Sequence, residues 1–196
     1  MSAQVDRITV TRRIRAAPEL VYGFFTDPAL WVRWQGTAAT VDAQPGGVLQ
    51  VVMGPGGSGV AEGRFVELEP FERIVFTWGW ASSPLSTLPP GSTVVTVHLR
   101  PDGDGTLVTL THDSLPQGER EIHEAGWSLY LDRLVAVANG GDPGPDPSLR
   151  GVEKPPPRPT SDRRPGSPQP GPSGGGASRR RSRERPAHRR LSTPPR

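Results

Sequence analysis

Hydrophobic and polar residues alternate along much of the first 113 positions of the chain, as they do in strands with one buried face. Within residues 6–15, for example, Ile8, Val10 and Ile14 fall on one side and polar residues on the other. Successive side chains of a strand point to opposite faces, so this period of two predicts strands. The predicted strands are residues 6–15, 37–44, 49–53, 60–69, 72–80, 92–101 and 106–113.

Other segments have the spacing of helices. Pro18 and the pair Asp27-Pro28 precede two short apolar stretches, and proline and aspartate favour the start of a helix. Residues 118–139 have apolar side chains at intervals of three and four and stop before Gly140, which predicts one long helix. A run of antiparallel strands with separate helices is an α+β arrangement, and a long helix across a curved sheet leaves room for an interior hollow.

Residues 63–80 contain a dense aromatic pattern. One face of the predicted strand 72–80 consists of Ile74, Phe76, Trp78 and Trp80. A face this apolar has to be covered by the chain itself or by a bound molecule. On the preceding strand, strict alternation would put Phe65 and Leu68 on opposite faces, which indicates a β-bulge.

The C-terminal part of the chain differs in composition. Residues 151–196 contain eleven Arg and one Lys against three acidic residues, a net charge of +9, whereas residues 1–150 have 11 basic and 17 acidic residues, a net charge of −6. Pro, Gly, Ser and Arg dominate from residue 142 onward, and such a composition cannot bury enough apolar area to fold. We therefore predict a folded domain of residues 1–141 and a disordered basic tail of residues 142–196.

Arginines are concentrated within this tail at residues 179–185 and 189–190. Such a cluster can bind nucleic acid or an anionic surface by releasing counterions. It is also typical of a solvated extension without a function, and the lack of aromatic residues for stacking favours that interpretation.

Composition also limits the chemistry and the location of the protein. The chain has no cysteine, which excludes disulfides and thiolate chemistry. No segment approaches the roughly 20 apolar residues that cross a bilayer, and the first residues lack the apolar core of a signal peptide. We therefore expect a cytoplasmic protein with no membrane span.

His112 and His123 are the candidates for chemistry. The pattern puts His112 on the inner face of the last strand and His123 in the first turns of the long helix, near one mouth of the hollow. A histidine pair can carry out acid–base catalysis or contribute to a metal site. Without a third clustered ligand, the pair is better interpreted as hydrogen-bonded anchors of the strand–helix junction. The sequence thus predicts no metal, no cofactor and no defined catalytic residue.

The inward positions predict a hydrophobic cavity, with a filled core as the alternative. Gly126 lies in the middle of the long helix, where glycine costs about 1 kcal/mol relative to alanine. It indicates either a close approach of helix and sheet or room for a ligand. The predicted wall consists of Trp34, Met53, Phe65, Phe76, Trp78, Trp80, Val97, Leu110, His112, His123, Gly126, Trp127 and Tyr130.

Six phrases of the sequence, in this order, are similar to those of a known family. They are APELVY (17–22), DPALWVRW (27–34), PGG (45–47), EPFERIVFTW (69–78), GTLVTLTH (105–112) and HEAGWSLYLDRL (123–134). Residues 5–138 thereby resemble the activator-of-Hsp90-ATPase-homologue-1-like domains of the START/Bet v 1-like (SRPBCC) superfamily, with Tyr22 where the family pattern has Trp. The resemblance implies a helix-grip fold, in which a curved antiparallel sheet of about seven strands surrounds a long C-terminal helix and a cavity.

The resemblance implies less about function. The superfamily binds lipids, steroids and polyketides and includes some cyclases and dehydratases, but the family supplies no fixed catalytic set to transfer. Nothing in the chain resembles the separate N-terminal domain of the eukaryotic co-chaperone, so Hsp90 stimulation is not implied.

The leading hypothesis is non-catalytic binding of a small hydrophobic or amphipathic molecule in an internal cavity. One alternative is a cyclase- or dehydratase-type enzyme that uses His112 or His123. Another is a chaperone-linked or stress-related protein-interaction module. A homodimer is compatible with the sequence, although the sequence identifies no interface for one.

Overall fold

The computed structural model describes residues 6–149, and these form one antiparallel sheet of eight strands together with three α-helices. The predicted α+β class and helix-grip arrangement are therefore confirmed. The strands are β1 (Asp6–Ile14), β2 (Ala38–Val41), β3 (Val48–Met53), β4 (Gly59–Glu69), β5 (Arg73–Trp78), β6 (Trp80–Ser82), β7 (Thr93–Asp102) and β8 (Gly105–Leu115). Their order in the sheet is β1-β8-β7-β5-β4-β3-β2, and β6 pairs with β4.

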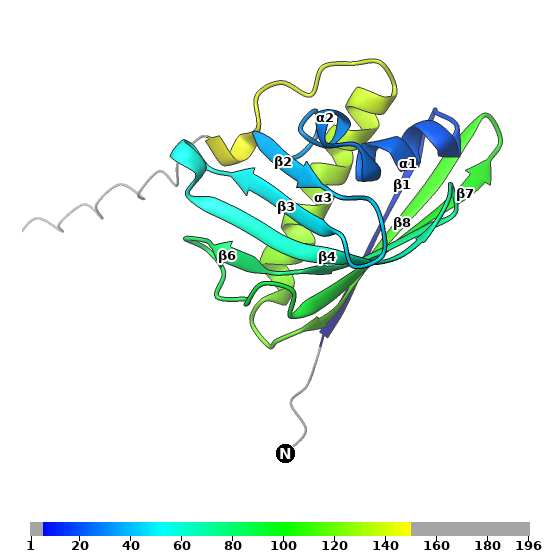
Figure 1. The fold of residues 1–196 in the computed structure, drawn as a ribbon. Coiled ribbons are helices and arrows are strands. Elements are labelled where there is room, and N and C mark those ends of the chain that lie inside the picture. Colours follow the sequence, from blue (N-terminus) through cyan, green and yellow to red (C-terminus); the bar gives the residue numbers. More distant parts are fainter. Residues whose placement is uncertain (1–5, 150–196) are drawn as a thin grey trace, which may run out of the picture. The chain divides into compact units, whose positions relative to one another are not determined.

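The long helix lies in the concavity of the curved sheet, and two short helices lie at one end of it (Figure 1). The helical elements are α1 (Pro18–Thr26), α2 (Pro28–Trp31) and α3 (Arg120–Ala138), with short 3-10 turns η1 (Pro55–Gly57) and η2 (Pro147–Leu149). As predicted, a proline occupies the first turn of α1 and of α2, and the Asp27 carboxylate caps α2 by accepting from the amide of Ala29 at 2.7 Å.

The predicted strand 72–80 is divided in two at Gly79, which is why the sheet has eight strands rather than about seven. A Cβ atom at Gly79 would lie only 1.7 Å from the carbonyl oxygen of Pro89, so only glycine fits here. The amide of Trp80 donates to the carbonyl of Leu88 at 2.8 Å. The chain thereby leaves the line of β5 and continues as β6 against β4.

The predicted bulge in β4 is confirmed. Phe65 lies opposite Phe76 of β5 and Leu68 lies opposite Ile74, with a register shift between Phe65 and Glu67. The extra residue lets Phe65 stay buried while the strand bends with the sheet.

Residues 142–149, which follow the predicted domain boundary at residue 141, pack against α3. The guanidinium group of Arg133 in α3 is buried and donates to the carbonyl oxygens of residues 143–145, each at 3.0 Å, and to that of Trp34 at 2.9 Å. A Pro- and Gly-rich segment has few apolar side chains to bury, but its backbone carbonyls are good acceptors for a buried cation. The predicted Arg cluster of the tail lies outside the described residues.

Asp146 is the second anchor of this segment. Its buried carboxylate accepts from the amide of Gly36 at 2.7 Å, from the hydroxyl of Tyr130 at 3.1 Å and from the amide of Ser148 at 2.9 Å. These bonds hold η2 beside the start of β2 and the middle of α3. Burial is the main reason why the pKa of Tyr130 is raised, and the Asp146 carboxylate adds to it.

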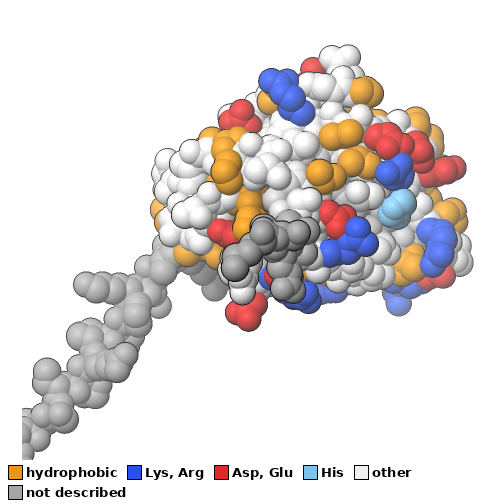
Figure 2. Space-filling model, turned by 90° about the horizontal axis from the view of Figure 1, so that it is seen from below, with side chains coloured by type: hydrophobic (Ala, Val, Ile, Leu, Met, Phe, Trp, Pro, Cys, Tyr) orange, Lys and Arg blue, Asp and Glu red, His pale blue; other side chains and the backbone are white. Residues whose placement is uncertain are grey.

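The outer surface carries charges of both signs. Figure 2 shows acidic and basic side chains interspersed with scattered hydrophobic ones on one face of the molecule. Arg13 of β1, for instance, pairs with Asp102 at 2.7 Å and Asp104 at 2.6 Å. Exposed pairs of this kind contribute little stability. None of the helices within residues 6–149 has the length and apolar character that a bilayer crossing requires.

Candidate functional site

A cavity of about 580 Å³ lies between α3 and one end of the sheet. Its walls come from α3, the ends of β3, β5 and β6, the loop after β6, and η2. Of the residues predicted to form such a wall, those that line it are Met53, Trp78, Trp80, His123, Gly126, Trp127 and Tyr130.

The other predicted wall residues lie in the packed core. These are Trp34, Phe65, Phe76, Val97, Leu110 and His112, each at most 1% exposed. Aromatic side chains from α1 and α2 fill the space above this part of the sheet, and the ring of Trp31, for example, packs edge-on against Phe76 with centroids 6.1 Å apart. The aromatic face of the sheet is thus covered by the chain at one end and borders the cavity from Trp78 onward.

Three tryptophans and a glycine belong to the cavity wall. The rings of Trp78 and Trp127 pack with centroids 5.0 Å apart, and Trp80 packs edge-on against Trp78 at 6.0 Å. A Cβ atom at Gly126 would meet no atom within 4 Å. Close approach to the sheet therefore does not explain this glycine, whereas room inside the cavity does.

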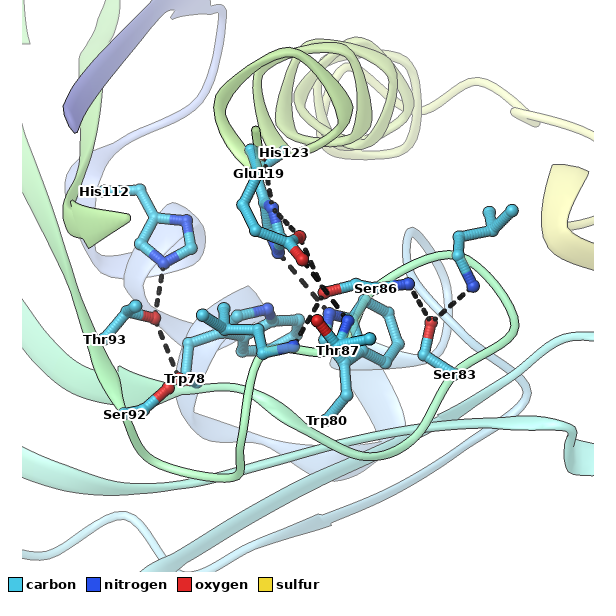
Figure 3. Close-up of polar contacts among 12 residues, drawn as sticks. Trp78, Trp80, Ser83, Ser86, Thr87, Ser92, Thr93, His112, Glu119 and His123 are labelled. Carbon is cyan, nitrogen blue, oxygen red and sulfur yellow. Dashed lines mark hydrogen bonds and ion pairs between the residues drawn. The ribbon is translucent and has the colours of Figure 1, made fainter. Parts of the chain in front are cut away.

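His112 has no free ring nitrogen. The Thr93 hydroxyl donates its one proton to the carbonyl of Trp78 at 2.8 Å, so it accepts from Nε2–H of His112 at 2.7 Å (Figure 3). The indole N–H of Trp127 donates to Nδ1 of His112 at 3.0 Å. Together these bonds require the neutral imidazole with its proton on Nε2.

The protonation of His112 agrees with this network. Burial lowers the pKa of His112 to about 3, with a smaller contribution from His123, whose ring centroid is 5.2 Å away. The side chain is therefore uncharged at neutral pH and joins β7, β8 and α3 through hydrogen bonds. This geometry favours the anchoring hypothesis for His112 over acid–base catalysis.

His123 is the histidine that borders the cavity. Its Nδ1–H donates to the backbone carbonyl of Glu119 at 2.8 Å, and the indole N–H of Trp80 makes a long bond of 3.4 Å to Nε2. The two histidine rings lie with centroids 5.2 Å apart, but only His123 borders the cavity and has a nitrogen that is weakly engaged.

The loop after β6 is held over the cavity by Glu119, the residue before α3. The Glu119 carboxylate accepts from the hydroxyl of Ser86 at 2.8 Å and from the amide of Thr87 at 3.3 Å (Figure 3). The hydroxyl of Ser83 accepts from the amides of Leu85 and Ser86, both at 3.1 Å. Residues 83–86 line the cavity, so these bonds position one of its walls.

Substitution Glu119→Ala is expected to loosen this loop without unfolding the domain. The loss of two acceptors for Ser86 and Thr87 should raise the hydrogen-exchange rate of the Thr87 amide by roughly tenfold. Glu119→Gln keeps an acceptor oxygen and should have a smaller effect. Equal exchange rates in the wild type and both variants would contradict the role of Glu119 as the loop's anchor.

A second hollow of about 390 Å³ lies where residues 141–146 meet α2 and α3. Its polar side chains include Arg133 and Asp146, which already bond to the residues around them. These groups hold the C-terminal segment in place, so we regard the larger, apolar cavity as the candidate site. Among residues 6–149, no three His, Asp or Glu side chains gather as a metal site would require.

Several residues that line the cavity were not predicted from the sequence, above all Gln35, Leu85 and Ser148. Leu85 and Ser148 lie in loops, where side-chain periodicity carries no information. Gln35 could have been recognised from the sequence, because it follows Trp31 by four residues, a spacing at which helical side chains meet. In the structure the two side chains form a hydrogen bond of 3.1 Å.

An antiparallel sheet curved around a C-terminal helix, with a cavity between them, places the protein among the SRPBCC-type helix-grip domains. The model of the family described as "Activator of Hsp90 ATPase homolog 1-like protein" matches residues 15–139. The chain therefore belongs to this family.

Individual relatives agree with the assignment. Over 124 residues the chain is 27% identical to human (Homo sapiens) Activator of 90 kDa heat shock protein ATPase homolog 1, a match that covers 63% of this chain but only 34% of the human protein. An AHSA1-like protein from Rhizobium etli, known from a solution NMR structure, is 38% identical with a TM-score of 0.56, covering 74% of this chain and 88% of that one. The Aha1 dimer from Colwellia psychrerythraea has the same fold at 18% identity and a TM-score of 0.57, covering 69% and 98% of the respective chains.

Proposed function

We propose that this domain binds a small, mainly apolar molecule in the cavity between α3 and the sheet. The observation that carries the proposal is the cavity itself, which has about 580 Å³ and is lined largely by apolar side chains, Trp78 and Trp127 among them. Cavities of roughly 300–1,000 Å³ with apolar walls and a few polar groups are typical of small-molecule sites.

The physical basis of binding would be the removal of apolar surface from water. Each Å² of apolar area transferred out of water contributes about 25 cal/mol, and the indole faces supply large, rigid contact areas. At the rim, Leu85 and Leu129 are 60% and 44% exposed, so the wall stays apolar from the interior to the surface. No covalent step is needed, in keeping with the full engagement of His112.

The substitution Gly126→Leu tests the proposal. Because a side chain at this position would enter open space, the introduced leucine should occupy the cavity without disturbing the fold, and replacing a helical glycine should add stability of up to about 1 kcal/mol. We expect the fluorescence titration of the neutral dye Nile red to show binding to the wild type and at least tenfold weaker binding to the variant. The melting temperature of the variant should be equal or higher.

Ala125, the neighbour of Gly126 in α3, provides a matched control. Ala125 is exposed, so Ala125→Leu adds a comparable side chain outside the cavity and should leave dye binding unchanged. Equal binding by Gly126→Leu and the wild type would show that the dye sits elsewhere. If native mass spectrometry finds no copurified molecule in the wild type and Nile red does not bind, the proposal is wrong.

A second candidate function is interaction with a protein partner through the rim of the cavity. It is supported by the exposed Leu85 and Leu129 together with two relatives, one described as an activator of a heat shock protein ATPase and one as a dimer. Sedimentation velocity of the full chain would detect a homodimer, and Leu129→Glu should dissociate it if the rim forms the interface. A monomer at all concentrations would exclude the dimer.

A further inference from the structure

Gln35 is a buried polar side chain in the wall of an otherwise apolar cavity. It lies just after α2 and is only 2% exposed. The indole N–H of Trp31 donates to its Oε1 at 3.1 Å. The Nε2 atom of the same amide can donate two hydrogen bonds of its own.

The bond to Trp31 fixes the orientation of the amide. An indole N–H can only donate, so the group that faces Trp31 must be the oxygen of Gln35, and the Nε2 donors must face away from it. Within residues 6–149 the side chain of Gln35 makes only the bond to Trp31, and the one fully buried side-chain atom without a partner is Nε of Arg73, so Nε2 of Gln35 is not sealed off in the interior. Since Gln35 lines the cavity, its N–H groups are the donors that the protein presents at this place.

The polar groups next to Gln35 already donate to Asp146, so they do not offer a donor to a molecule in the cavity. The hydroxyl of Tyr130 donates to Asp146 at 3.1 Å, and the hydroxyl of Ser148 donates to the same carboxylate oxygen at 2.5 Å. The backbone amide next to Gln35, that of Gly36, also donates to Asp146. Asp146 thus accepts the hydrogen bonds of these three donors, and the Gln35 amide remains available to a bound molecule.

The described wall of the cavity contains no Asp, Glu, Lys or Arg side chain. An ionised ligand would lose its hydration without gaining a counter-charge there, which is costly. An uncharged molecule with one acceptor oxygen would instead satisfy the Gln35 donor and place its apolar part against Trp78 and Trp127.

We infer that Gln35 donates a hydrogen bond to the carbonyl oxygen of an uncharged, largely aromatic or apolar ligand. This assignment rests on the proposed function, because it names the class of molecule that would occupy the same cavity. Gln35 would select among apolar molecules of similar size, since a donor left unpaired in a complex weakens that complex.

Two probes that differ at one group test the assignment. 2-Acetylnaphthalene has a carbonyl where 2-ethylnaphthalene has a methylene, and both can be titrated against the full chain by quenching of tryptophan fluorescence. For the wild type we expect about tenfold tighter binding of the ketone, the effect of one buried hydrogen bond. Gln35→Leu should lose this preference, because no donor remains to pair with the carbonyl oxygen of the ketone.

Gln35→Glu is a second variant that preserves the acceptor for Trp31 but presents an oxygen to the cavity. At pH 8 it should prefer 2-ethylnaphthalene. Gln50, on the opposite side of β3 from the buried Leu49 and Val51, offers a control: Gln50→Leu should keep the wild-type preference.

The outcomes separate this assignment from the proposed function. If the wild type binds both probes without preference, or if Gln35→Leu keeps the preference, the role of Gln35 is wrong while cavity binding stands. Equal loss of both probes in both Gln35 variants would also overturn it, because Gln35 would then only maintain the shape of the cavity. If the wild type binds neither probe, the proposed function fails as well.

Discussion

Replacement of Arg133 by methionine is expected to lower the free energy of unfolding by about 3 kcal/mol, because the hydrogen bonds of a buried charged group are each worth about 1.5–3 kcal/mol. The guanidinium joins α3 to the carbonyl of Trp34 and to those of residues 143–145. Methionine fills part of the space but donates no hydrogen bond. Urea unfolding followed by tryptophan fluorescence would measure the difference.

The same variant should release the segment that begins at residue 142. Limited proteolysis should then cut within residues 142–149 faster than in the wild type. Because Pro147 and Ser148 line the cavity, Nile red should also bind more weakly.

Arg120 provides the matched control on the same helix. Its exposed pair with Glu124 spans 3.5 Å, and Arg120→Met should change stability by less than about 1 kcal/mol. If Arg133→Met proved as stable as Arg120→Met and as resistant to protease, the anchoring role of Arg133 would be refuted.

Substitution His112→Leu is expected to cost about 3 kcal/mol at pH 7, because the buried N–H of Trp127 would lose its acceptor and an unsatisfied buried donor costs about 1–3 kcal/mol in addition to lost packing. Thr93 would retain its bond to the carbonyl of Trp78. A stability loss with unchanged Nile red affinity would fit an anchor that does not touch the ligand.

The pH dependence of this variant distinguishes an anchor from an exposed histidine. An unfolded chain binds a proton at His112 below a pKa of about 6.5, whereas burial holds the folded-state pKa near 3. Between these values the unfolded state binds the extra proton, so the wild type loses stability as the pH falls, by up to about 1.4 kcal/mol per pH unit from this group.

His112→Leu lacks this contribution. The stability gap between wild type and variant should therefore shrink by about 2 kcal/mol between pH 7 and pH 5. The exposed His98 of β7 provides a control for stability, since His98→Gln should change the free energy of unfolding at pH 7 by less than about 1 kcal/mol. A gap that stays constant from pH 7 to pH 5 would mean that His112 is not held neutral by burial.

Several features of the fold could be predicted because they depend on neighbours in the chain. The period of two located the strands, the spacing of Phe65 and Leu68 indicated the bulge, and Asp27 with Pro28 marked the start of α2. The aromatic face of β5 was also recognisable, since the period of a strand alone decides which side chains share a face.

Contacts between distant segments were not predictable in the same way. The break between β5 and β6 at Gly79 depends on the close approach of the Pro89 carbonyl to this glycine. The packing of residues 142–149 depends on hydrogen bonds from Arg133. Composition alone suggested disorder for that segment, because composition measures apolar content and not the backbone carbonyls that a buried cation can bind.

For the candidate site, the sequence by itself indicated an aromatic sheet face, a long helix with a central glycine to cover it, and two histidines at the junction of the last strand and that helix. Only the tertiary structure decided how that face is shared, with α1 and α2 filling one end of it and a cavity beside Trp78 at the other. The orientation of the Gln35 amide, with Nε2 facing away from Trp31, also depends on the tertiary structure. The physical reason is that periodicity describes the direction of each side chain, whereas a cavity is the volume left over when elements far apart in the chain have packed together.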